Sequence, residues 1–155
     1  MTRTFMTILL AAAAGGVSAD SWLPPIPVTA LSDGGAYRLT VYPRQLSESL
    51  EHFSDKVDGN APAGQRAGGR AQCEATLEKL GPQSYEVVWR KPLVNDVAPL
   101  SALVADGGRF VTFDNWHHVG IGEDTIAIYQ ADGTLVKKHR LEDVVSEDVA
   151  RKLRR

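Results

Sequence analysis

Apolar and polar residues alternate along most of the chain, which predicts β-strands rather than helices. Residues 37–42 alternate in this way, and so do residues 84–91, where Tyr85, Val87 and Trp89 are expected on one face. A period of two residues is the signal of a strand with one buried face. The same pattern predicts further strands over residues 71–78, 101–105, 109–114, 125–130 and 134–140. We therefore predict a mainly β fold.

Asp-Gly sequences separate several of these strands. Asp33-Gly34-Gly35 and Asp106-Gly107-Gly108 each stand before a strand, and Asp132-Gly133 joins the last two. An Asp-Gly pair suits a type I′ turn, in which both central residues take positive φ. We therefore predict a type I′ hairpin at Asp132-Gly133.

The chain contains an internal repeat. Residues 31–42 align with residues 104–115 through Asp-Gly-Gly, and each copy is followed by a strand, a turn and a strand. This unit, over residues 31–42 and 71–144, resembles a blade of the β-propellers found in secreted bacterial proteins. Because propellers close with four or more blades and about two fit here, the central-channel function of that family is not carried over. We expect two antiparallel blade-like sheets that form a small sandwich or a partial propeller.

Three segments lack the strand pattern. Residues 20–32 carry three prolines and are predicted to form an extended arm. Residues 43–70 are rich in Gly, Ala and Pro, which predicts a mobile insertion with a short helix over residues 46–53. Residues 33–155, which include this insertion, are expected to form one β domain. It ends in a short C-terminal helix, because three apolar residues are spaced four apart: Val145, Val149 and Leu153.

The N-terminus has the pattern of a secretory signal peptide over residues 1–19. Arg3 precedes an apolar run at residues 5–14, and small residues lead to a predicted cleavage site after Ala19. The run is about half of the roughly 20 residues that a membrane-spanning helix needs, so no stable membrane insertion is expected after cleavage. The short, Ala-rich leader indicates a bacterial protein that is periplasmic or secreted.

Charge and cysteine usage narrow the choice of partners. The net charge is −2, and the leader removes one arginine, so the mature chain is weakly acidic and nucleic acid is not an expected partner. Cys73 is the only cysteine, which excludes an intramolecular disulfide. It lies on the apolar face of its strand and is predicted to be a buried thiol. A disulfide-linked dimer is the alternative.

The densest group of polar and aromatic residues lies between two predicted strands, and loops over a sheet often carry binding groups. A metal site needs three or four converging ligands. Adjacent His117 and His118 would point to opposite faces of a strand, so no metal is predicted. Asp114, Trp116 and His118 would share one face if the strand continued through them. The alternative is that Asp114 and Asn115 bond nearby backbone amides while Trp116 covers the sheet edge. The candidate binding residues are Asp114, Asn115, Trp116, His117, His118, Glu123 and Asp124.

No nucleophile elbow, phosphate loop, dinucleotide fingerprint or zinc-protease motif is present in the sequence. We therefore predict a non-enzymatic binding or interaction module without a cofactor, whose partner is an envelope protein or a surface polymer. One alternative is a structural envelope component that forms a homo-oligomer through its repeat edges. Another is a metal-dependent hydrolase that uses His117, His118 or Asp114.

Overall fold

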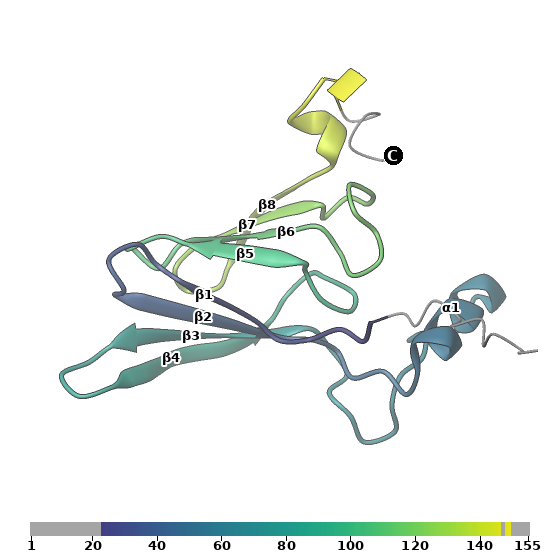
Figure 1. The fold of residues 1–155 in the computed structure, drawn as a ribbon, viewed down its shortest axis with the longest axis horizontal. Coiled ribbons are helices and arrows are strands. Elements are labelled where there is room, and N and C mark those ends of the chain that lie inside the picture. The colour runs from purple at the N-terminus through teal and green to yellow at the C-terminus, as the bar shows by residue number, and fades with distance from the viewer. Residues whose placement is uncertain (1–22, 147, 150–155) are drawn as a thin grey trace, which may run out of the picture.

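The computed structural model describes residues 23–146, 148 and 149, and its strands form two four-stranded antiparallel sheets (Figure 1). This confirms the predicted mainly β fold with two antiparallel sheets. The other elements are helix α1 (Ser49–Asp58) and the 3-10 turn η1 (Leu141–Asp143). The first sheet contains β1 (Val28–Leu31), β2 (Tyr37–Tyr42), β3 (Glu74–Leu80) and β4 (Tyr85–Pro92). The second contains β5 (Ser101–Val104), β6 (Phe110–Phe113), β7 (Ile126–Tyr129) and β8 (Leu135–His139).

The two sheets lie in layers and share one apolar core between them (Figure 1). Leu39 and Leu77 of the first sheet are fully buried, and Phe110 and Tyr129 of the second stack with ring centroids 4.5 Å apart. Alternation along each strand sends these residues inward and their neighbours outward. In the described part of the chain, no helix is long and apolar enough to cross a membrane.

The first strand arises from the predicted proline-rich arm. Residues 28–31 form β1, which pairs antiparallel with β2 and sets Val28 opposite Val41. The prolines end at Pro27, so from Val28 onward every residue has the N–H group that a sheet ladder needs. The arm without sheet pairing is therefore shorter than residues 20–32.

The predicted type I′ turn at Asp132-Gly133 is wrong. Within the loop of residues 131–133, only Gly133 takes a positive φ, at 83°. Gly133 N donates to Gln130 O at 3.0 Å, and Gln130 N donates to Thr134 O at 2.9 Å. These bonds define a three-residue loop that ends in a left-handed glycine, the second common kind of hairpin connection.

The insertion at residues 43–70 has more structure than its composition predicts. Its helix is α1, which begins after the predicted start because Leu46 is extended and bridges Gln65. The remaining residues fold back on the helix, since Gly64 N donates to the Asp55 carboxylate at 2.7 Å. Figure 1 places α1 beyond one end of the sheets. The mobility of this segment stays a prediction.

Two predicted features fall on residues that the structure does not describe. The signal peptide, residues 1–19, lies entirely outside the described residues. The predicted C-terminal helix lies mostly outside them as well, because residues 147 and 150–155 are not described.

Cys73 is fully buried, which confirms the predicted buried thiol. Burial raises the pKa of this thiol to about 12. A disulfide between two copies would therefore require the core to open first.

We expect Cys73 in the folded chain to react with a thiol reagent at pH 8 at least about a thousandfold more slowly than in denaturant, because only the thiolate is a nucleophile. The measurement is the rate of aromatic disulfide exchange with and without urea. Similar rates in both conditions would show that the core around Cys73 opens readily.

Candidate functional site

The predicted site lies in the loop between β6 and β7. Asp114 and His117 are the described non-glycine residues with positive φ, at 59° and 61°. Such values mark sharp bends that non-glycine residues adopt only rarely. As a result, the seven candidate residues do not converge on one point but fall into separate groups.

The first group is bonded locally. Asp114 Oδ1 accepts a hydrogen bond from Gly120 N at 2.7 Å, and Asn115 Nδ2 donates to Asp124 Oδ1 at 3.0 Å. Buried Asn95, which the sequence analysis did not identify, donates from Nδ2 to Asn115 Oδ1 at 2.7 Å. These contacts hold the shape of the loop. Asp114 accepts from a backbone amide, as the structural alternative expected, whereas Asn115 bonds to the side chains of Asp124 and Asn95.

Trp116 and His117 form the second group, which packs against Phe53 of α1. Trp116 is 8% exposed, and its Nε1 donates to Leu23 O at 3.2 Å. Its ring stacks on Phe53 of α1 with centroids 5.8 Å apart. Trp116 therefore joins the N-terminal arm to the helix, rather than covering a sheet edge as the alternative supposed. Burial lowers the pKa of His117, and the nearby His118 and His52 lower it further.

These two residues line an apolar groove, which we call the arm groove. It has a volume of about 580 Å³ and lies between residues 23–28 of the arm, residues 98–100 and the Trp116 loop. Apart from His117 and the indole N–H, the side chains that line it are aliphatic, proline or aromatic. Leu23 and Ile26 remain 78% and 69% exposed at its side. The arm groove therefore presents apolar surface that the described residues leave uncovered.

A cluster of buried polar residues packs against Trp116 through His52. Arg44 is 2% exposed, forms an ion pair with Asp96 at 3.3 Å and donates to Gln65 Oε1 at 3.3 Å. His52 Nδ1 lies 3.0 Å from Ala63 O, and the His52 ring meets Trp116 edge-on at 5.6 Å. No pattern along the chain indicated this cluster, because Arg44 and His52 lie in the insertion, where apolar and polar residues follow no regular period.

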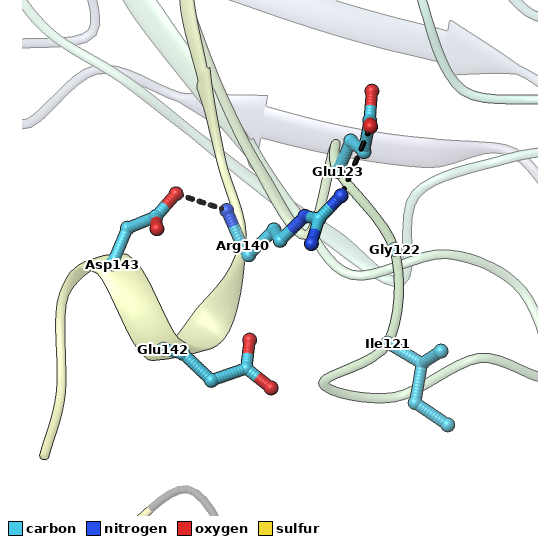
Figure 2. A pocket seen from close by; sticks show the side chains of 6 residues that line it. All are labelled: Ile121, Gly122, Glu123, Arg140, Glu142 and Asp143. Atoms are coloured by element: carbon cyan, nitrogen blue, oxygen red, sulfur yellow. Dashed lines mark hydrogen bonds and ion pairs between the residues drawn. The ribbon is translucent and has the colours of Figure 1, made fainter. Parts of the chain in front are cut away.

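Glu123 belongs to a third group at the end of β8, shown in Figure 2. Its carboxylate accepts a hydrogen bond from Arg140 at 3.0 Å and lies 3.6 Å from Lys138 Nζ. The Arg140 hydrogen bond, with help from the charge of Lys138, holds the pKa of Glu123 below its usual range. The hollow beside it measures about 670 Å³ and is also lined by Glu142 and Asp143. Ion pairs this exposed contribute little to stability.

The loop does not assemble the ligands of the hydrolase alternative. Asp114 is bonded to Gly120, His117 lines the arm groove, and His118 is exposed. Within residues 23–146, 148 and 149, no three His, Cys, Asp or Glu side chains are grouped closely enough to hold a metal ion.

The comparisons with known proteins identify no relative. No family model, no curated protein and no solved structure matches the chain. The resemblance to propeller blades therefore rests on the sequence pattern alone.

Proposed function

We propose that this chain is an exported, non-enzymatic binding module that holds a polypeptide segment of another envelope protein in the arm groove. The observation that carries the proposal is the groove itself, whose lining is apolar over a volume of about 580 Å³. Ligand sites are typically concave, mostly apolar and equipped with only a few polar groups. Trp116 and His117, two of the candidate residues from the sequence, both line the groove, and His117 is the polar side chain among the lining residues.

The chemistry of the arm groove favours a polypeptide over a surface polysaccharide. A sugar chain carries many hydroxyl groups, and each loses free energy when it is buried without a hydrogen-bond partner. The indole N–H of Trp116 already donates to Leu23 O, so it is not available as a hydrogen-bond donor to sugar hydroxyl groups. Apolar side chains of a protein segment meet no such cost.

The edges of the sheets give weaker support to the oligomeric alternative. The outer strands β4 and β8 each carry a register shift, next to Leu77 and Ile128 on their partner strands. Bulges and lysines on an edge strand hinder pairing with another chain, and Lys91 and Lys137 lie on these two strands. The other two edges, β1 and β5, lie against each other. We therefore prefer the groove as the interaction site.

Site-specific photo-crosslinking in the native host tests this proposal. A benzophenone amino acid replaces Val119, which lines the arm groove and is 55% exposed, or Val87, which is 64% exposed on the other sheet. We expect discrete polypeptide adducts, identified by mass spectrometry, from position 119 and not from position 87.

A matched pair of variants then checks that the groove is responsible. Leu23→Asp places a charge in the arm groove, whereas Leu50→Asp places it on α1, and the two leucines are 78% and 67% exposed. We expect Leu23→Asp to reduce the adducts of position 119 at least about tenfold, because a carboxylate is costly to bury without a partner. Adducts to glycan alone, or equal loss in both variants, would contradict the proposal.

A further inference from the structure

The second sheet has an apolar outer face as well as an apolar inner one. The outer apolar face consists of Leu103, Val111, Phe113, Ile126 and Ile128. Strand pairing aligns these residues across β5, β6 and β7. Leu103 is 63% exposed and Ile128 is 37% exposed, while the other three are half-buried. This face points away from the shared core, which the sheet meets with its alternate residues.

The outer face of the first sheet is different in character. Thr29, Thr40 and Thr76 lie side by side across β1, β2 and β3. Next to them, Arg38 makes two hydrogen bonds to the Glu78 carboxylate, at 2.6 and 2.9 Å. A sheet with one polar face is an outer layer, whereas a sheet that is apolar on both faces is typical of a layer covered on both sides. The second sheet therefore needs a cover that the first does not.

We infer that the C-terminal segment, residues 144–155, packs across the outer apolar face. The spacing of Val145, Val149 and Leu153 predicts an amphipathic helix with one apolar stripe. Of the described residues on this stripe, Val149 is 43% exposed and Val145 is half-buried, so apolar surface of the segment is left uncovered at Val149. A helix of about ten residues is roughly 15 Å long. Four strands spaced about 4.8 Å apart are roughly 14 Å across, so the helix spans the sheet.

The chain leaves the sheet in the direction that this packing requires. The segment follows β8, the edge strand of the same sheet. His139 pairs with Ile126, so its imidazole lies on the outer face, and the Asp143 carboxylate is 4.0 Å from its Nδ1. Turn η1 thus begins on the outer side of β8. Figure 1 shows turn η1 on the side of this sheet that is opposite to the first sheet.

A segment of the same chain is a better occupant than a second copy. A short tether holds the segment at an effective concentration on the order of millimolar, so a second copy competes only when its own concentration approaches that value. A stable interface between two proteins uses roughly 20–30 residues on each side. The outer apolar face has five, which suits one short helix.

Hydrogen exchange of the full chain after removal of the leader tests the inference. Leu103→Asp places a charge on the outer apolar face, and Val87→Asp is its control on the first sheet, since the two residues are 63% and 64% exposed. We expect slowed exchange of residues 144–155 in the unaltered chain. Leu103→Asp is expected to speed it at least about tenfold by removing an apolar contact, and Val87→Asp to leave it unchanged.

A second pair of variants alters the segment itself. Val149→Asp changes the apolar stripe and should speed exchange as Leu103→Asp does, whereas Arg151→Asp, a larger change of charge on the opposite side of the predicted helix, should not. Light scattering at increasing concentration accompanies these measurements and should report a monomer. Exchange of residues 144–155 at the rate of an unstructured peptide would overturn the inference. A dimer that Leu103→Asp dissociates would overturn it too, because the occupant would then be a second copy.

Discussion

Gly64→Ala is expected to destabilise the fold by about 2–5 kcal/mol. Gly64 has a φ of +60°, and a Cβ atom there would lie 2.6 Å from His52 Cα. That neighbour is helix backbone, so α1 must shift and carry His52 away from Trp116. The shift also breaks the hydrogen bond from Gly64 N to the Asp55 carboxylate. Urea unfolding followed by circular dichroism measures the loss.

Gly68→Ala is the matched control for this substitution. Gly68 also has a positive φ, +71°, but no heavy atom beyond the residue itself and its two chain neighbours lies within 4 Å of the added Cβ. It therefore carries the cost of the left-handed conformation alone, about 1–2 kcal/mol. Equal losses for the two variants would show that the contact between the insertion loop and α1 is not formed in solution.

Leu77→Ala is expected to cost about 2–5 kcal/mol, the range for a leucine removed from a packed core. Leu77 is fully buried near the centre of β3, where it faces the second sheet. Leu80→Ala, on the same strand, changes a residue that is 52% exposed. Its expected cost is within about 0.5 kcal/mol. The unfolding midpoints of both variants test this, and a reversed order would refute the inward orientation of Leu77.

The strands were predictable because alternation along one strand is a local property. Leu39 and Val41 of β2 show the pattern and are buried as expected. Alternation gave the wrong face for Val87, because the face of that residue depends on how β4 pairs with β3. Trp89 pairs with Leu77 and faces inward, but a bulge shifts the register, so Val87 pairs with Glu78 and is 64% exposed. One strand read alone does not show a bulge, because the extra residue is defined only against its partner.

The candidate loop could be located from sequence, but its division into groups could not. Positive φ at Asp114 and His117 redirects the side chains, and neither residue type requires it. The arm groove depends on contacts between distant segments, such as the hydrogen bond from Trp116 to Leu23. Arg44 and His52, which lie in a segment without periodicity, become buried only because the insertion folds back on α1. Such contacts follow from tertiary packing and leave no local pattern.

The hydrogen bond between Trp116 and Leu23 has a practical consequence for work with this protein. It fixes Leu23, in the N-terminal arm, beside the arm groove. An affinity tag or fusion partner attached just ahead of Leu23 therefore emerges next to that opening and competes with whatever enters it. A tag placed after residue 155 is instead attached to the segment that we propose packs on the outer apolar face. An internal tag in the exposed turn between β3 and β4, at Pro82 and Gln83, avoids both surfaces.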